Sequence, residues 1–383
     1  MRPVISPGWT RPARPEMSGE ATYLRHHLRG LDNWNPTATS AGEHLQQVRR
    51  MDLNECPYPP SPKVQAAIEG VFARLNRYAD GSCPELAARL SATTGVPVPN
   101  ILFGPGSTQL LKCIIEISAG PGDNVVSPSL LWHRFHGIYE ALEADATLVT
   151  NRPDGSIDVA QLTRAIGNRT RMLVVITPNN PTGMMLLEDE LRHVILQTPD
   201  NVMLFVDEAY HEFAMHAGGP DALRMLQRER SGPWIVSRTF SKAYALAGLR
   251  LGYAMCSSPE IANAVRLMSS TFVVSAFAEA AALAALDDPD YSSFIVEDTA
   301  RERARIIEGL RALGCEPMNS VTNFVSADVG RPGIDVVAAM RERGIRIARW
   351  AYPEYGNYIR VSMGAPEDTD AFLDALAEIL GTS

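Results

Sequence analysis

The sequence predicts an α/β protein. We expect a large domain built on a mostly parallel sheet with helices on both faces, followed by a smaller α+β domain. Short and almost entirely apolar segments recur between residues 101 and 240, and stretches with helical periodicity separate them. Apolar runs of this length are typical of parallel strands that are buried on both faces of a sheet. After about residue 285 the pattern changes to one long helix followed by shorter strands and helices.

Composition supports two domains and argues against several classes of protein. The chain has 383 residues, of which 45% are hydrophobic, and its net charge is −9. An acidic chain without a broad basic face is not expected to bind nucleic acid. The five cysteines lack a C-x-x-C spacing, which argues against a disulfide framework or a metal site and favours a cytoplasmic location. No apolar run is long enough for a transmembrane helix, so we expect no membrane partner.

The first part of the chain is expected to precede the large domain. Residues 1–50 are polar and are expected to form an N-terminal extension, and residues 51–75 are expected to belong to the small domain. Residues 61–75 have a helical period, with Ser61 as a candidate cap and Pro62 in the first turn.

The large domain is expected over residues 76–285 and the C-terminal small domain over residues 286–383. In the large domain we expect strands at 101–104, 123–128, 171–178, 202–210 and 233–240, and helices at 109–117 and 132–144. In the small domain we expect helices at 291–313 and 333–343, and strands at 322–329, 344–350 and 358–364.

Polar residues follow the carboxyl ends of the expected strands. Asn180 follows strand 171–178, Asp207 and Tyr210 lie at the end of the next strand, and Lys242 follows the one after it. Ligands of open α/β sheets bind beyond the carboxyl ends of the strands. We therefore expect these four side chains to converge on one crevice.

Lys242 lies in the segment TFSKAYALAGLR, residues 239–250, among groups that suit an anion. The hydroxyls of Thr239 and Ser241 and the guanidinium of Arg250 are donors of the kind that bind phosphate. A partly desolvated lysine can lose its proton and attack an aldehyde. Together they predict pyridoxal 5'-phosphate, joined to Lys242 as a Schiff base. The alternative is an ordinary surface lysine at the start of a helix.

Asp207, Tyr210 and Asn180 complete this prediction. A buried aspartate keeps the pyridine nitrogen of the cofactor protonated, so that the ring can accept electrons. Tyr210 and Asn180, in the segment NNPTG, can each donate a hydrogen bond to the phenolic oxygen of the ring. Taken singly, Asp207 is also explained as a helix cap and NNPTG as a plain turn.

The segment GPGSTQLL, residues 104–111, predicts a place for the phosphate. It joins a strand to a helix, and the backbone N–H groups at such a junction bind anions. Gly106, Ser107 and Thr108 are the candidates within it. Trp132 follows strand 123–128 and is either a residue that stacks on the cofactor ring or ordinary core.

In this order, the residues resemble the fold-type I pyridoxal-phosphate-dependent aminotransferases, and most closely the histidinol-phosphate aminotransferase group. The similarity extends from about residue 52 to 381 and includes DLNECPYPPSP, GPGST, NNPTG, DEAY, RTFSKAYALAGLR, TNF and YIRVSMG. The chain departs from the family at Cys56, where Asn is usual, at Thr108 and Gln109, where Asp and Glu are usual, and at Trp132, where Tyr or Phe is usual.

The resemblance implies a shared active site in a homodimer, because Tyr78 would contact the phosphate of the partner subunit's cofactor. It also implies that Arg360 binds the substrate α-carboxylate, that Arg349 binds a substrate phosphate, and that Tyr58 and Asn323 belong to the substrate site. Residues 344–364 are expected to form two strands joined by a turn at 353–357, which would point both arginines into one cleft. The implied reaction is amino transfer from histidinol phosphate to 2-oxoglutarate.

Several alternatives stay open at this stage. The donor can instead be an aromatic amino acid or a metabolite of a specialised pathway. The same scaffold also suits a phospho-amino-acid decarboxylase, a lyase or a cyclase. A non-catalytic regulatory domain that binds the cofactor is a further alternative, although residues 1–50 contain no helix-turn-helix pattern. For Arg349 the alternative role is a surface ion pair.

Overall fold

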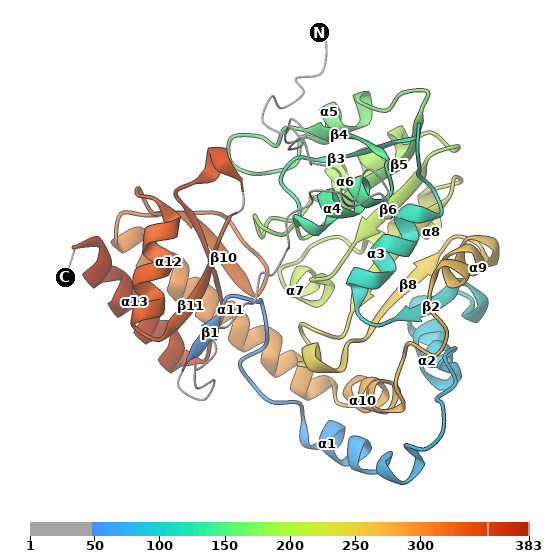
Figure 1. The fold of residues 1–383 in the computed structure, drawn as a ribbon, viewed down its shortest axis with the longest axis horizontal. Coiled ribbons are helices and arrows are strands. Elements are labelled where there is room, and N and C mark those ends of the chain that lie inside the picture. Colours follow the sequence, from blue (N-terminus) through green and yellow to red (C-terminus); the bar gives the residue numbers. More distant parts are fainter. Residues whose placement is uncertain (1–47, 351, 382–383) are drawn as a thin grey trace, which may run out of the picture.

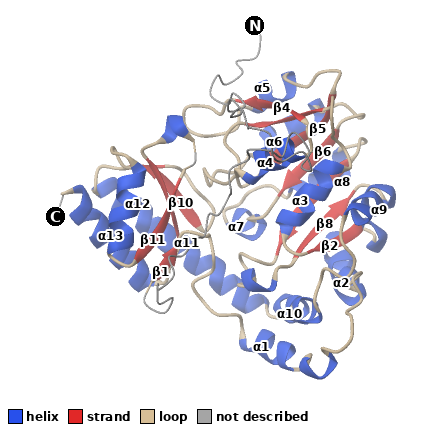
Figure 2. Ribbon diagram, in the orientation of Figure 1, coloured by secondary structure: helices blue, strands red, loops and turns tan. Residues whose placement is uncertain are grey.

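The architecture is described here from a computed structural model of the chain, in which residues 48–350 and 352–381 are described. The greater part of the expected N-terminal extension, residues 1–47, lies outside them. Figure 1 shows a large body around one sheet and a smaller body around a second sheet. Figure 2 shows helices packed around the strands of both sheets.

The larger sheet has seven strands in the order β2-β8-β7-β6-β5-β3-β4. All neighbouring pairs are parallel except β7–β8 and β2–β8, so the expected mostly parallel sheet is confirmed. The strands are β2 (Ile101–Gly104), β3 (Asn124–Pro128), β4 (Asp145–Val149), β5 (Thr170–Ile176), β6 (Met203–Asp207), β7 (Trp234–Thr239) and β8 (Gly252–Cys256).

Two strands of this sheet were not expected from the sequence. β4 lies at the edge of the sheet and only its last two residues are buried, so it lacks a continuous apolar run. β8 follows closely after the segment that contains Lys242, and it is buried along its whole length. It is short, and it directly follows a segment that was read as part of the cofactor site, so it was not recognised as a separate strand.

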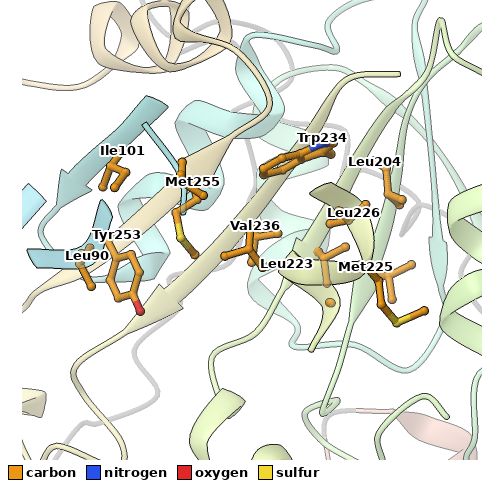
Figure 3. Packing of buried hydrophobic residues seen from close by; sticks show 14 of the residues in the cluster. Leu90, Ile101, Leu204, Leu223, Met225, Leu226, Trp234, Val236, Tyr253 and Met255 are labelled. Atoms are coloured by element: carbon orange, nitrogen blue, oxygen red, sulfur yellow. The ribbon is translucent and has the colours of Figure 1, made fainter. Parts of the chain in front are cut away.

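Both faces of the sheet are buried. Adjacent residues of each strand point to opposite faces, so alternate residues belong to different hydrophobic clusters. Leu204 and Val206 of β6 join one hydrophobic cluster, while Phe205 between them joins the other. Figure 3 shows the first cluster, in which Leu223 and Leu226 pack near Val236 of the sheet.

Helices on both faces supply the rest of the two clusters. One face is covered by α2 (Pro84–Thr94), α5 (Val159–Arg164), α6 (Glu188–Gln197), α8 (Ala222–Glu229) and α10 (Ala276–Leu286). The other face is covered by α3 (Ser107–Glu116), α4 (Arg134–Ala141) and α9 (Pro259–Met268).

The helix expected at 61–75 is shorter in the structure. α1 (Pro62–Glu69) begins as expected, since the Ser61 hydroxyl accepts a hydrogen bond from the Val64 N–H at 3.3 Å. It ends at Gly70, and a separate 3₁₀ turn, Phe72–Arg74, follows. Glycine is a poor residue for a helix interior, which explains the early end.

The smaller sheet has five strands in the order β1-β11-β12-β10-β9. They are β1 (Arg49–Met51), β9 (Glu316–Pro317), β10 (Phe324–Asp328), β11 (Ile345–Arg349) and β12 (Tyr358–Ser362). Three helices pack on one face of it, namely α11 (Pro289–Ala312), α12 (Gly333–Glu342) and α13 (Pro366–Leu380). The short helix α7 (His211–His216) follows Tyr210 and contacts α11.

The start of the described chain belongs to this smaller sheet, because β1 pairs in parallel with β11. β1 was not expected, and it begins one residue before the end that we set for the N-terminal extension. None of the helices in the described ranges is long and apolar enough to cross a bilayer.

Candidate active site

A cavity of about 950 Å³ lies where the carboxyl ends of β5, β6 and β7 face the small sheet. The structure brings most of the candidate residues to this one place. Those that line it are Ser107, Thr108, Trp132, Asn180, Asp207, Tyr210, Thr239, Ser241, Lys242, Arg250, Arg349 and Arg360.

Lys242 follows β7 and reaches across the cavity to the segment before α1. Its Nζ donates hydrogen bonds to the carbonyl oxygens of Asn54, at 2.7 Å, and Leu53, at 3.4 Å. Burial, together with the nearby charges of Arg360 and Arg250, lowers the pKa of Lys242 to about 7. The amine is therefore partly neutral at neutral pH, as a nucleophile toward an aldehyde must be.

Asp207 is the last residue of β6 and is only 5% exposed. Its Oδ1 accepts hydrogen bonds from the Ser237 hydroxyl, at 3.0 Å, and from the Ala209 N–H, at 3.2 Å. Burial raises the pKa of this carboxyl to about 6. A cation placed against it offsets that burial, so the site suits a protonated ring nitrogen.

Tyr210 and Asn180 lie next to each other and meet different partners. The Tyr210 hydroxyl accepts a hydrogen bond from Asn54 Nδ2 at 2.9 Å, and the Tyr210 ring centroid lies 5.9 Å from Lys242 Nζ. Burial raises the pKa of Tyr210 to about 12, so the hydroxyl keeps its proton and can donate it. The Asn180 carbonyl accepts a hydrogen bond from Arg360 Nη1 at 2.9 Å.

Arg360, on β12, faces the cavity with part of its guanidinium unused. Its Nη2 donates to the Asp52 carbonyl at 2.7 Å, and its Nε is buried without a hydrogen-bond partner. Burial also lowers its pKa. Buried donors are nearly always paired in native proteins, so the bare Nε indicates that an anionic group completes this site.

The loop before α3 forms a cradle that only glycine permits. Gly106 has φ 81° and ψ 161°, a conformation that is essentially restricted to glycine. A Cβ on Gly106 would lie 2.3 Å from Arg250 Nη2, and a Cβ on Gly252 would lie 2.5 Å from the Ser107 nitrogen. The first turn of α3 and Arg250 thus meet at close range.

Hydroxyl groups complete the cradle. Thr239 Oγ1 donates to Ser241 Oγ at 3.0 Å and accepts from the Ser241 N–H at 3.1 Å. Hydroxyls, a helix N-terminus and a guanidinium together form a donor set for phosphate. With Lys242 and Asp207 at the other end of the cavity, the residues fit pyridoxal 5'-phosphate.

Four candidates do not line the cavity in this chain, namely Gly106, which lies in the loop just before its lining residue Ser107, and the three described next. The Tyr58 hydroxyl donates to Asp298 Oδ2 at 2.6 Å. Asn323 is 3% exposed and donates through Nδ2 to the Asn54 carbonyl at 2.9 Å. Tyr78 is 83% exposed and stacks on Phe272 at a centroid distance of 4.7 Å.

The two arginines of the expected hairpin both line the cavity, but they leave opposite faces of the small sheet. β11 and β12 are antiparallel, with Ala348 opposite Arg360 and Arg349 opposite Ile359. Since side chains alternate between faces, Arg349 and Arg360 leave opposite faces of the sheet. Both still line the cavity, because Arg349 is the last residue of β11. The Arg349 side chain is exposed, and its Nη1 donates to the Trp350 carbonyl at 3.2 Å.

Sequence reasoning assigned no role to several residues that line the cavity, among them Asp52, Asn54, His133, Arg341, Arg346 and Tyr352. Arg346 forms an ion pair with Asp52 at 3.2 Å. Burial lowers the pKa of His133, and the charge of Arg360 lowers it further. The alternation of β11 was a usable signal, because it places Arg346 on the face opposite the apolar Ile345 and Ile347. Within the described ranges, no group of three or more His, Cys, Asp or Glu side chains could hold a metal ion.

Comparison with known proteins gives consistent results. The family model described as "Aminotransferase class I and II" matches residues 47–376. An aromatic amino acid aminotransferase of Streptomyces coelicolor is 34% identical over 362 residues, which are 94% of this chain and 99% of that protein. Histidinol-phosphate aminotransferase 2 of Pseudomonas aeruginosa is 36% identical over 333 residues, or 87% of this chain and 89% of that protein. The crystal structure of histidinol-phosphate aminotransferase from Sinorhizobium meliloti in complex with pyridoxal-5'-phosphate has a TM-score of 0.84 at 28% identity, covering 94% of this chain and 98% of that one.

Proposed function

Because the chain belongs to the class I and II aminotransferases, we propose that it transfers the amino group of histidinol phosphate to 2-oxoglutarate. The protein is an enzyme, and its cofactor is pyridoxal 5'-phosphate. When bound, this cofactor supplies an electron-accepting ring that stabilises negative charge on the substrate carbon next to the amino group.

Side chains around the cavity move the proton and bind the cofactor ring and its phosphate. The Nζ of Lys242 takes the proton from that carbon and delivers it to the carbon that receives the amino group, because a pKa of about 7 suits both steps at neutral pH. Asp207 holds the proton of the ring nitrogen. Tyr210 and Asn180 bind the ring oxygen, and the cradle around Gly106 binds the cofactor phosphate.

The proposal of a phosphorylated donor rests on the charge of one wall of the cavity. Arg341 of α12, Arg346 and Arg349 of β11, and Arg360 of β12 all line it. Asp52 pairs with Arg346. The exposed guanidinium of Arg349 stands at the cavity edge, where the far end of a substrate would lie, and its planar fork suits a dianionic phosphate.

A comparison of donors tests this proposal. With 2-oxoglutarate as acceptor, we expect a much higher kcat/KM for histidinol phosphate than for phenylalanine. Arg349→Ala should raise KM for histidinol phosphate about 10- to 100-fold, as expected for losing one charge-assisted hydrogen bond, and should change KM for phenylalanine little. Arg343→Ala is the matched control, because Arg343 is the C-cap of α12 and pairs with Glu378 outside the cavity. Equal effects of Arg349→Ala on both donors would contradict the phosphate role.

The same assay separates transamination from the other chemistry that this scaffold suits. Transfer requires a keto acid and yields glutamate from 2-oxoglutarate. Decarboxylation or elimination proceeds without any acceptor and yields a different product. Product formation that is independent of 2-oxoglutarate would therefore overturn the proposed reaction.

An aromatic amino acid is the second candidate donor. Trp132, Trp350 and Tyr352 line the cavity together with Leu131, so one part of its wall is aromatic and apolar. Relatives named aromatic amino acid aminotransferases are as similar to the chain as those named histidinol-phosphate aminotransferases. If phenylalanine or tyrosine is the better donor and Arg349→Ala has no selective effect, the aromatic assignment replaces the first.

We also propose that the enzyme is a homodimer. The support is a group of exposed aromatic side chains that no other described part of the chain covers. Phe72 is 60% exposed, Tyr78 83% and Phe272 55%, and Tyr78 and Phe272 stack on each other. Exposed aromatic groups of this kind mark protein–protein contacts. Light scattering should give about twice the mass of one chain, and a monomer at assay concentration would contradict the proposal.

A further inference from the structure

Asn54 lies at a point where both sheets and the catalytic lysine meet. It is 2% exposed and belongs to the segment between β1 and α1. Its carbonyl oxygen accepts hydrogen bonds from Lys242 Nζ at 2.7 Å and from Asn323 Nδ2 at 2.9 Å. Its side chain lies between Tyr210, in the large domain, and Ser362, at the end of β12. The polar groups of this residue therefore connect Lys242, Asn323, Tyr210 and Ser362.

The backbone of Asn54 makes this arrangement possible. Its φ is 55°, in the left-handed region that asparagine adopts more readily than most residues. In this conformation the residue presents its carbonyl to Lys242 and its side chain to Tyr210. A glycine would keep the same backbone without the side chain, which makes Asn54→Gly the suitable substitution for a test.

Ser362 determines which end of the Asn54 amide faces Tyr210. The Asn54 N–H donates to Ser362 Oγ at 2.8 Å, so the serine proton is free to donate to Asn54 Oδ1, which lies 3.0 Å away. The Asn54 oxygen thus faces Ser362, and Nδ2 faces the Tyr210 hydroxyl at 2.9 Å. These partners therefore fix the orientation of the Asn54 amide, which places an N–H group against the Tyr210 oxygen.

A second amide acts on Tyr210 in the same way. Asn180 Oδ1 accepts a hydrogen bond from Arg360 Nη1 at 2.9 Å, so its NH₂ group points away from that arginine. The Asn180 side chain also acts to lower the pKa of Tyr210, as a donor to the Tyr210 oxygen does. The Tyr210 oxygen therefore receives donors, and its own proton has to point elsewhere.

We propose that Asn54 is a positioning residue that directs the Tyr210 hydroxyl proton toward the ring oxygen of the cofactor. The inference rests on the proposed function, because it concerns how Tyr210 meets the bound cofactor. An N–H that donates to the Tyr210 oxygen occupies an acceptor site and also makes the hydroxyl a stronger donor. In this role the Asn54 side chain, unlike its backbone carbonyl, contacts no reacting atom, and it acts through Tyr210.

The consequence is a shift in the pH at which the bound cofactor changes colour. A hydroxyl that donates to the ring oxygen stabilises negative charge there, which eases loss of the proton from the nitrogen that joins Lys242 to the cofactor. Losing the Asn54 amide weakens this donation and moves the transition to higher pH. The charged groups that face Tyr210 are Arg360 of β12, Asp207 of β6 and Lys242 after β7.

Those charges are the same in every variant of the test. Lys242 itself is faced by Arg360, Glu55 and Arg250, which the substitutions also leave unchanged. The removal of a neutral side chain from Asn54 introduces no charge near the cofactor. A change in the pH transition therefore reports on hydrogen bonding to Tyr210.

The experiment follows the absorbance of the pyridoxal-phosphate-loaded enzyme from acid to alkaline pH. Asn54→Gly should move the transition up by about half a pH unit to one unit, the size expected for loss of one ordinary hydrogen bond. Ser362→Ala frees the Asn54 amide to turn and should give a smaller shift in the same direction. This variant also keeps the test usable if Asn54→Gly fails to fold.

A double-mutant cycle and a matched control complete the design. In a Tyr210→Phe background, Asn54→Gly should add no further shift, because the hydroxyl through which it acts is gone. Asn100→Gly makes the same substitution at a buried asparagine that donates to the Cys256 carbonyl outside the cavity, and it should leave the transition unchanged.

The outcomes separate this inference from the proposed function. If both Asn54→Gly and Ser362→Ala bind the cofactor with the wild-type transition, Asn54 does not position Tyr210. A shift from Asn54→Gly that persists in full in the Tyr210→Phe background also overturns the inference. A wild-type protein that binds no pyridoxal phosphate would overturn the proposed function itself.

Discussion

Gly106→Ala should weaken cofactor binding although it adds only one methyl group. The new Cβ would lie 2.3 Å from Arg250 Nη2, far inside van der Waals contact. Arg250 cannot keep its position, and the loop cannot easily move, because Gly106 already has a conformation that other residues adopt only at a cost of about 1–3 kcal/mol. The substitution therefore strains the loop and displaces the guanidinium that we assign to the cofactor phosphate.

The size of the effect follows from the bond that is lost. A hydrogen bond to a charged group contributes about 1.5–3 kcal/mol, which corresponds to a loss of about 10- to 100-fold in affinity. We expect the dissociation constant of pyridoxal phosphate, measured by fluorescence titration of the cofactor-free protein, to rise by that factor. The Michaelis constant of the amino donor should change much less, because the arginines of β11 and β12 are untouched.

Two further variants decide whether the reasoning holds. Gly120→Ala is the control, since a Cβ there meets no atom within 4 Å, and it should change the affinity by less than about twofold. In an Arg250→Ala background, Gly106→Ala should cost much less affinity than in the wild type, because the clash is gone. If Gly106→Ala binds the cofactor as tightly as Gly120→Ala, the cradle does not hold the phosphate and the assignment of Arg250 fails with it.

Other predictions concern the lysine, the subunit contact and the stability of the sheet. The folded-state pKa of Lys242 is lowered to about 7, so above that pH the unfolded chain binds more protons than the folded one. The melting temperature of the cofactor-free enzyme should gain a contribution that rises from about pH 7 to about pH 10, and Lys242→Met should lack it; parallel melting curves of the two proteins would refute this. Borohydride should fix the cofactor to Lys242 in the wild type only. Mixing inactive Tyr78→Phe subunits with Lys242→Ala subunits should restore activity if the active sites are shared, and no recovery in confirmed hybrids would argue against sharing. Arg238→Met leaves the buried carboxylate of Glu208 without the guanidinium 2.8 Å away, and it should lower the free energy of unfolding in urea by about 3–5 kcal/mol, more than Arg238→Met with Glu208→Leu.

Local sequence patterns were enough to predict the frame of the large domain. β5, β6 and β7 each contain a run of at least three apolar residues, because both faces of these runs are buried, and such a run can be recognised without knowledge of the partner strands. Polar residues that follow such strands must emerge at one edge of the sheet. For this reason Asn180, Asp207, Tyr210 and Lys242 could be placed in one cavity before the fold was seen.

Features that depend on strand pairing could not be predicted from the sequence. β1 has only three residues, and they form a strand because they pair with β11, some 300 residues later in the chain. The faces of Arg349 and Arg360 depend on the register between β11 and β12, in which a shift of one residue reverses every side chain. Their separation along the chain carries no information about that register.

The role of Asn54 shows the same limit within the active site. The sequence DLNECPYPPSP marks its segment as one that the family shares, but it does not indicate which residues Asn54 contacts. Its partners Tyr210, Asn323 and Ser362 come from positions 156, 269 and 308 residues away. Hydrogen bonds act over about 3 Å, so only the packing of the small sheet against the ends of β6 and β7 could bring these groups together. The sequence by itself determined the chemistry that the site can perform, and the tertiary structure decided which side chains orient it.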